Sequence, residues 1–515
     1  MALGGFDDRF VRELPGDPVL DPRPRQVHHA AWSRVAPTAV PAPRMVACAD
    51  EVAELLGWTP EQVRSEPFVA MLGGNNVPDG STPYAACYGG HQFGHWAGQL
   101  GDGRAITLGE VLGPAGRLEV QLKGAGPTPY SRGADGRAVL RSSVREFLCS
   151  EAMAHLGVPT TRALSLVTTG EGVVRDMLYD GHPRVEPGAV VCRVAPSFLR
   201  FGSYEIHAAR GDVDTLGRLV DHTLAAHYPH LGTGRGAVVA WLAEVGVRSA
   251  KLVAEWMRVG FVHGVLNTDN LSILGITVDY GPYGWLEGYD PDWTPNTTDA
   301  ANRRYRFANQ PAVVGWNLSR LASALVPLVG EAEPLEEALR EYSRAVGAAL
   351  RETHARKLGL RELRPDDQDL LVELDAVLQL VETDFTTFWR GLGELSSEDD
   401  LGAIEPAFYR PPAPADRARI HRWVARWLQR ASDDGVDPAE RRARMRLANP
   451  RFVLRNWLAQ LAIDRAEQGD PGGVLELLDA VRRPYDDVPG RDADAARRPE
   501  WARNRAGCSM LSCSS

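Results

Sequence analysis

The stretch His263-Gly264-Val265-Leu266-Asn267-Thr268-Asp269-Asn270 decides the fold of this chain, and after an apolar run it is followed by Asp279-Tyr280-Gly281. Asp269 and Asn270 end a polar loop and Asp279 follows a strand-like segment, so we expect their oxygen atoms to converge at one strand end. Asn270 and Asp279 suit Mg²⁺, which takes one or two protein oxygens and completes its shell with water and substrate phosphates. Asp269 is a candidate acceptor for the proton of a hydroxyl group.

This arrangement resembles the catalytic loop and the Asp-Phe-Gly motif of a protein kinase, with Tyr280 in place of Phe. In a kinase the catalytic base lies two residues after the His, and here that position is Val265. The base for phosphoryl transfer is therefore lost or moved. A structural alternative stays open at this point, because Asp and Asn in such a loop also cap turns and bind backbone N–H groups.

A lysine and a glutamate in the N-terminal half support the kinase-like interpretation. Val120-Gln121-Leu122-Lys123 alternates as a half-buried strand and is similar to the Val-Ala-Ile-Lys of a kinase. Glu146 lies on a predicted helix and could pair with Lys123, as the helix-borne glutamate of a kinase does. The alternative is that Ser143 and Glu146 form a capping box at the start of a helix.

Glycines and arginines in the same half are candidates for phosphate contacts. Glycines are frequent over residues 88–105, where Gly101-Asp102-Gly103-Arg104 leads into a short strand and lets the backbone approach a ligand closely. Arg193 and Arg200 flank a short apolar segment, and guanidinium groups suit phosphate oxygens. Taken singly, each feature is equally compatible with an ordinary turn or a surface hinge.

Composition limits the class of protein. A chain of 515 residues exceeds what one hydrophobic core supports, so two or three lobes are expected. Its 44% hydrophobic and 24% charged residues are typical of a globular protein. The net charge of -10 argues against a nucleic-acid binder that depends on bulk electrostatics, although a local basic cleft could hold a nucleotide.

The sequence predicts a cytoplasmic protein with no membrane and no nucleic-acid partner. We find no apolar run approaching the roughly 20 residues that span a bilayer. The first residues also lack the basic and apolar regions of a secretory signal. The cysteines at positions 48, 87, 149 and 192 are expected in the core, whereas Cys508 and Cys513 form a candidate redox pair or two idle thiols in a frayed tail.

The predicted fold class is α+β, with a small β-rich lobe and a large helical lobe as in a protein kinase. The expected boundaries are an N-terminal extension over residues 1–85, a β-rich N-lobe over 86–200, a helical C-lobe with the catalytic and metal loops over 201–465, and a mobile tail over 466–515. The tail is rich in Asp, Arg, Gly and Pro, which is typical of a segment without a packed core.

Taken together, these motifs resemble the selenoprotein O family of protein adenylyltransferases, which are similar to kinases but transfer AMP. The resemblance rests on Gly101, Gly103, Arg104, Lys123, Glu146, Arg193, Arg200, Asp269, Asn270 and Asp279. It implies a kinase-like fold in which ATP binds in the reverse orientation. The α-phosphate then meets the acceptor hydroxyl, and pyrophosphate leaves.

The resemblance also implies a role for each site residue. Contacts to the nucleotide fall to Gly101, Gly103, Arg104 and Lys123, and contacts to the outer phosphates to Asp135, Gly136, Arg193 and Arg200. Asp269 becomes the proton acceptor, and Asn270 and Asp279 hold Mg²⁺, with Mn²⁺ as the alternative metal. Cys513 lies where some relatives carry selenocysteine, which indicates a redox position.

The expected activity is transfer of AMP from ATP to Ser, Thr or Tyr hydroxyls of proteins, redox-related proteins among them, by a monomer. UTP is a second expected donor, giving UMP transfer. Two alternatives remain from the sequence. One is a true protein kinase that transfers the γ-phosphate, and the other is a non-catalytic ATP-binding pseudokinase scaffold with a redox-active tail.

Overall fold

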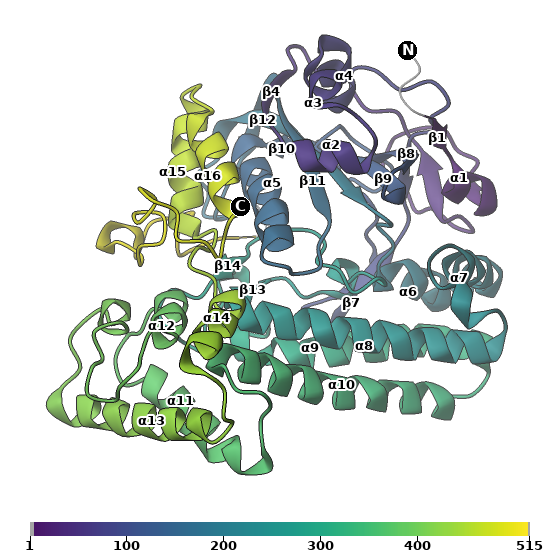
Figure 1. Cartoon of the computed structure of the whole chain (residues 1–515). Coiled ribbons are helices and arrows are strands. Elements are labelled where there is room, and N and C mark those ends of the chain that lie inside the picture. The colour runs from purple at the N-terminus through teal and green to yellow at the C-terminus, as the bar shows by residue number, and fades with distance from the viewer. Residues whose placement is uncertain (1–4, 513–515) are drawn as a thin grey trace.

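A sheet-rich N-terminal lobe and a helical lobe make up the protein (Figure 1). The structure is a computed structural model and describes residues 5–512. The sheet lobe is coloured purple to blue and the helical lobe teal to green in Figure 1. The predicted two-lobed α+β architecture is confirmed.

The N-terminal lobe is built on a ten-stranded sheet. Its main path runs β2-β3-β5-β8-β9-β12-β11-β4, with β1 paired to β8 and β10 to β12. The strands are β1 (Phe6–Asp7), β2 (Gly16–Asp17), β3 (Trp32–Arg34), β4 (Arg44–Cys48), β5 (Tyr84–Ala86), β8 (Ala105–Gly113), β9 (Gly116–Lys123), β10 (Ala138–Val139), β11 (Arg162–Arg175) and β12 (Arg184–Ala195). Strand β9 buries Leu118, Val120 and Leu122, so the predicted alternation is confirmed.

Residues before 86 belong to this sheet and do not form a separate extension. β4 pairs with β11 at one end of the sheet, and β5 pairs with β8 in its interior. Short helices follow β4 and cover the lobe, namely α2 (Asp50–Leu55), α3 (Pro60–Arg64) and α4 (Glu66–Leu72), while α1 (Arg9–Glu13) precedes β2. The added strands pair backbone groups that an edge strand would otherwise leave open.

Two small two-stranded sheets lie apart from the main sheet. One pairs β6 (Gly89–Gln92) with β7 (His95–Gln99), and the other pairs β13 (Phe261–Val262) with β14 (Gly284–Trp285). Strands β13 and β14 flank the catalytic and metal loops in the sequence, because they lie on either side of residues 263–283.

Long helices form the second lobe. They are α6 (Phe201–Ala209), α7 (Val213–His227), α8 (Arg235–Val259), α9 (Gln310–Val329), α10 (Glu333–Leu358), α11 (Gln368–Leu378), α12 (Phe385–Leu392), α13 (Pro414–Ser432) and α14 (Pro438–Ala448). Helices α8 and α10 end at Gly260 and Gly359, whose positive φ angles form left-handed caps. The segment Phe307–Val329 is long and apolar enough to cross a membrane, but half of its apolar window is buried, and α9 packs on α6, α8 and α10.

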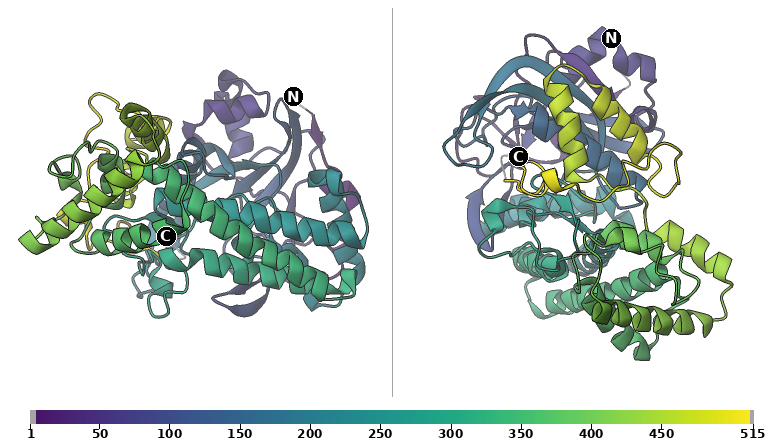
Figure 2. Two further views of the ribbon diagram at one scale, coloured as in Figure 1. Left: turned by 60° about the horizontal axis from the view of Figure 1, so that its bottom comes forward. Right: turned by 90° about the vertical axis from the view of Figure 1, so that its left-hand side faces the viewer.

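The chain then returns to the sheet lobe. Helices α15 (Asn456–Glu467) and α16 (Gly472–Val481) pack against α5 (Leu140–His155), and the turned view in Figure 2 shows both lying over the sheet. Val474 and Leu478 on α16 are buried. The prediction of a mobile tail from residue 466 is therefore wrong, because α16 carries apolar residues at helical spacing and buries them.

A buried ion pair joins α15 to the helical lobe. Arg455, the residue before α15, donates to both carboxylate oxygens of Asp384 at 2.8 and 2.9 Å. Both side chains are almost fully buried, at 1% and 0% exposure. Asp384 also caps α12 by accepting from the backbone N–H of Thr387 at 2.9 Å.

Asp384→Ala is expected to lower the free energy of unfolding by about 3–5 kcal/mol, because it removes the bidentate partner of the buried Arg455, leaves Glu287 to balance its charge, and removes the N-cap of α12. Chemical denaturation measures the change. The control is Glu341→Ala, which breaks the exposed pair with Arg344 and is expected to cost less than about 1 kcal/mol. Equal effects of the two substitutions would contradict this assignment.

Candidate active site

The carboxylate of Asp279 lies among three cations at the junction of the two lobes. Arg193 from β12 donates to Oδ1, and Arg200, which precedes α6, donates to Oδ2. The Nζ of Lys123, at the end of β9, is 3.5 Å from Oδ1. Arg200 also donates to the backbone carbonyl of Asp269 at 2.8 Å, so it links the metal loop to the catalytic loop.

Glu146 on α5 completes the cluster. Its Oε2 is 2.6 Å from the Nζ of Lys123, and its Oε1 accepts from Arg193 at 3.0 Å. The capping-box alternative is wrong, because α5 begins at Leu140 and Glu146 is inside the helix. Lys123 and Glu146 form the ion pair that connects strand and helix in an active kinase.

The cluster carries more positive than negative charge. Within residues 5–512, Lys123, Arg193 and Arg200 form ion pairs with two carboxylates, those of Glu146 and Asp279. The buried carboxylates of Asp102 and Asp269 also interact electrostatically with Arg200. Burial alone would raise the pKa of Asp279, but Arg200, Arg193 and Lys123 hold it well below its usual value. Burial lowers the pKa of Lys123, an effect opposed by Glu146 and Asp279. An anionic ligand would balance the remaining positive charge in this water-poor site.

Asp269 lies under the β6–β7 hairpin. Its Oδ2 accepts a hydrogen bond from the side-chain amide of Gln92 at 3.2 Å, and its Oδ1 is buried with no hydrogen-bond partner within the described residues. Burial raises the pKa of Asp269 to about 7, although Gln92 and Arg200 lower it. A carboxylate with a pKa near neutrality and one free oxygen suits proton transfer.

The glycine-rich hairpin fits over the catalytic loop through its backbone. A Cβ on Gly90 would lie 2.8 Å from Oδ1 of Asp269, so only glycine allows this approach. The N–H of His91 donates to the hydroxyl of Thr268 at 2.7 Å, and the N–H of Phe93 donates to Asn267 at 3.2 Å. The close approach that the glycines predicted is thus made to the catalytic loop of the protein itself.

Asn270 and Asp279 fit the predicted metal role by their chemistry. The amide nitrogen of Asn270 donates to the carbonyl of Val265 at 2.9 Å, which leaves its amide oxygen as the ligand atom. Asp279 is ionised at neutral pH because its pKa is low. Its φ angle of 61° lies in a region that non-glycine residues rarely adopt, as is common at functional sites. Two hard oxygen donors of this kind suit Mg²⁺.

The predicted phosphate-binding glycines pack against one loop. A Cβ on Gly101 would meet the ring of Tyr130 at 2.3 Å, and one on Gly103 would meet its backbone oxygen at 3.0 Å. Gly136 has φ of 70°, and a Cβ there would lie 2.2 Å from the backbone of Gly126. Arg104 is partly exposed in the turn before β8.

Asp135 is not part of the cation cluster. Its carboxylate is paired with Arg175 of β11 at 2.7 Å and accepts from the N–H of Arg137 at 2.9 Å. In the described part of the chain it has no ion pair with Lys123, Arg193 or Arg200. The contacts of its side chain therefore do not support the predicted contact with the outer phosphates, because the carboxylate already accepts from Arg175 and Arg137.

Of the two tail cysteines, the structure describes only Cys508. The expectation of an exposed Cys508 in a mobile tail is wrong, since Cys508 is buried and burial raises the pKa of its thiol to about 11. A thiol of this kind stays protonated at neutral pH and reacts slowly. Cys513 lies outside the described residues. The cysteines at positions 48, 87, 149 and 192 are buried, as predicted.

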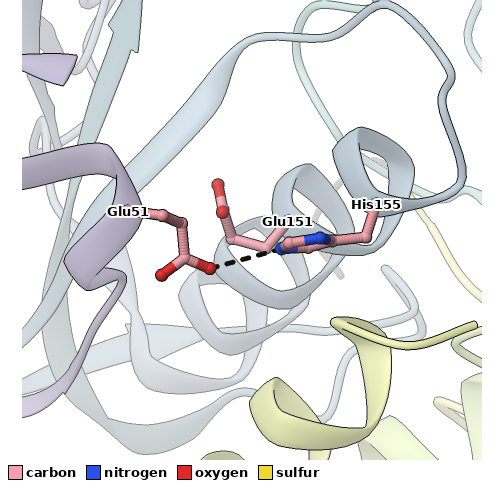
Figure 3. A group of neighbouring side chains, drawn as sticks. All are labelled: Glu51, Glu151 and His155. Carbon is pink, nitrogen blue, oxygen red and sulfur yellow. Dashed lines mark hydrogen bonds and ion pairs between the residues drawn. The ribbon is translucent and has the colours of Figure 1, made fainter. Parts of the chain in front are cut away.

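A second group of possible metal ligands, Glu51, Glu151 and His155, lies at the far end of α5 (Figure 3). Arginines already occupy its carboxylates. Arg482 donates to both oxygens of Glu51 at 3.0 and 2.9 Å, and Arg162 donates to both oxygens of Glu151 at 3.0 and 2.6 Å. We therefore regard the group as an ionic link that fixes α5 to α2 and to the end of α16.

A buried carboxylate with a pKa near neutrality, a second carboxylate held ionised by three cations, and an amide oxygen available on the catalytic loop together define an active site for group transfer from a nucleotide. The chain belongs to the protein adenylyltransferase SelO family, whose model matches residues 20–482. It is therefore an enzyme, a protein nucleotidyltransferase, and the predicted resemblance is confirmed. This decides against the non-catalytic scaffold.

Curated relatives match over almost the whole chain. A protein nucleotidyltransferase YdiU of Xanthomonas axonopodis pv. citri is 60% identical over 514 residues, covering 99% of each chain. One of the same name from an Azoarcus species is 58% identical over 518 residues, again covering 99% of each. Among solved structures, the chain matches ROP2 from Toxoplasma gondii, a virulence factor with a protein-kinase fold and no enzymatic activity. The match is 12% identical and covers 78% of this chain and 87% of that one, and its TM-score of 0.20 is too low to support a structural comparison.

Sequence reasoning missed the residues that support the predicted ones. Gln92 holds Asp269, Gln121 accepts from Arg193, and the ring of Tyr88 lies 4.6 Å from the Arg200 guanidinium. The glycine-rich segment was the available signal for Gln92. Its partner could not be identified, because the contact joins residues 177 positions apart.

Gln92→Leu is expected to raise the pKa of Asp269, because it removes the hydrogen bond that favours the ionised carboxylate. The base works only when ionised, so the acid limb of the pH profile of kcat/KM moves from about 7 to a higher pH, and activity returns in alkaline buffer. His95→Ala, at an exposed position of the same hairpin, is the control and should leave the limb in place. An unshifted limb in Gln92→Leu would show that Gln92 does not position the base.

Proposed function

We propose that this enzyme transfers AMP from ATP to Ser, Thr or Tyr hydroxyls of proteins, with ATP in the reverse of the kinase orientation. The observation that carries the proposal is the difference in pKa and contacts between Asp279 and Asp269. Asp279 is held ionised by three cations, whereas Asp269 has a free buried oxygen and a pKa of about 7. One is suited to a charged phosphate site, and the other to accepting a proton.

The cation cluster is the proposed site for the phosphates that leave. Lys123, Arg193 and Arg200 carry the charge that a pyrophosphate group needs, and arginine presents two parallel donors to phosphate oxygens. Guanidinium groups now engaged with Asp279 would turn to the ligand. Once these groups contact the phosphates, they need no further reorganisation during the reaction. Preorganised sites stabilise a transition state in this way.

In the proposed reaction the acceptor oxygen forms a bond to the α-phosphorus. The bond between that phosphorus and the oxygen bridging to the β-phosphate breaks, and pyrophosphate departs with the electron pair. Asp269 takes the proton of the acceptor hydroxyl on its carboxylate. The β6–β7 hairpin, held on the catalytic loop by Gln92 and by the His91 N–H, keeps water from this carboxylate.

Asn270 and Asp279 would hold the divalent metal, Mg²⁺ or Mn²⁺. When bound, such an ion neutralises phosphate charge and orients the nucleotide. Lys123 and the two arginines would then be free for the phosphates, since metal and phosphate together replace the present contacts of Asp279. UTP is a second proposed donor, because the contacts proposed here are made to phosphate.

The test is transfer from ATP labelled either at the α- or at the γ-phosphate, with dephosphorylated casein as the acceptor and Mg²⁺ present. We expect label on protein from the α-position only, and none with Asp279→Ala. Asp369→Ala, an exposed aspartate on α11, is the matched control and should transfer normally. Transfer of the γ-label alone would identify a protein kinase, and label from neither position would contradict the proposal.

A further inference from the structure

Two arginines share one tryptophan beside the β6–β7 hairpin. The guanidinium carbon of Arg304 lies 4.6 Å from the ring centre of Trp316, and that of Arg320 lies 5.1 Å from it. Trp316 and Arg320 belong to α9, and Arg304 belongs to the loop before it. Within residues 5–512 neither guanidinium forms an ion pair with a carboxylate, although the chain carries a net charge of -10.

Arg304 has unused hydrogen-bond donors. Its Nε and Nη2 atoms are buried and have no hydrogen-bond partner among the described residues. The nearest acidic residue in the loop is Asp299, whose carboxylate accepts instead from the backbone N–H groups of Arg304 and Tyr305 at 3.0 and 2.7 Å. Buried donors without acceptors are costly, and a carboxylate that approaches this guanidinium group gains a charge-assisted interaction with it.

Arg320 strengthens the local positive charge. Among residues 5–512, the hydrogen bonds of its side chain are two long ones, of 3.3 Å, to the hydroxyl of Ser319. A second cation next to the same indole repels the first, and an anion beside them relieves that repulsion. The pair is therefore complementary to an acidic group and not to a basic or neutral one.

The pair lies beside the catalytic loop. A Cβ on Gly94, at the tip of the hairpin, would lie 3.5 Å from the guanidinium carbon of Arg304. The ring of His91 is 5.5 Å from Trp316, and Gln92 between these two positions donates to Asp269. Trp96 on the same hairpin is 39% exposed, and its ring lies 5.1 Å from that of His91.

We infer that Arg304 and Arg320, stacked on Trp316, form a subsite of the acceptor protein that selects hydroxyl groups flanked by Asp or Glu side chains. The inference rests on the proposed function, because that function places the acceptor hydroxyl at Asp269. The phosphates of ATP are assigned to other cations, namely Lys123, Arg193 and Arg200. The carboxylate of an acceptor side chain is the ligand that remains for Arg304.

The first test compares dephosphorylated casein with the same protein after its carboxyl groups are converted to amides. With α-labelled ATP we expect the KM of the native enzyme to be about tenfold higher for the amidated acceptor, because the amide loses one charge-assisted hydrogen bond to the arginines. The double variant Arg304→Gln/Arg320→Gln should show one KM for both acceptors and an unchanged KM for ATP.

The control is Arg340→Gln/Arg344→Gln, which removes two exposed arginines of α10 that pair with Glu337 and Glu341. This variant should discriminate between the two caseins as the native enzyme does. Equal KM values for the native enzyme, or discrimination that survives in Arg304→Gln/Arg320→Gln, would overturn the subsite.

A binding measurement separates this inference from the proposed function. Two fluorescent peptides carry one Ser flanked by Glu or by Gln, and anisotropy reports their affinity at low ionic strength. The native enzyme should bind the Glu peptide about fivefold or more tightly than the Gln peptide, and the double variant should not. Discrimination without AMP transfer would overturn only the function, and AMP transfer without discrimination would overturn only the subsite.

Discussion

The carboxylate of Asp279 is shared by Arg193 and Arg200, with Lys123 3.5 Å from one of its oxygens, and the rest of the structure positions these four groups. Each cation comes from a different element: β9, β12 and the turn before α6. The charges of Arg193 and Arg200 are buried, and buried charges are stable only when paired with good geometry. The two lobes therefore meet where Asp279 pairs with these cations. The pairing fixes the position of the sheet relative to the catalytic loop.

Helix α5 is the second support, since it carries Glu146 to the cluster. It is fixed at several points along its length. Arg145 donates to the carbonyl of Tyr283 at 2.8 Å, and the Tyr283 hydroxyl donates back to the carbonyl of Arg145 at 2.8 Å. The ionic link at Glu51 and His155 and the packing of α15 and α16 hold its other end and its outer face. The C-terminal helices thus stabilise the Lys123–Glu146 pair from outside the site.

The local sequence was enough to predict much of this, because strand alternation placed Lys123 and short motifs marked Asp269, Asn270 and Asp279. It failed where contacts join distant segments. Residues 32–48 show no clear alternation, so their sequence does not reveal that β3 and β4 enter the main sheet. Composition made 466–515 look unstructured, although α16 buries an apolar face. Asp135 was assigned from the motif alone, and its pairing with Arg175 depends on the neighbouring strand β11.

The most direct measurement is calorimetric titration of ATP into Asp279→Asn without divalent metal, with thermal unfolding to show that the variant is folded. If Asp279 occupies the cations that bind phosphate, removal of its charge frees them. ATP should then bind the variant about tenfold or more tightly than the native enzyme, since one competing charge-assisted contact is lost. Weaker metal-free binding to Asp279→Asn would contradict the account, because it would show that the three cations do not serve as the phosphate site.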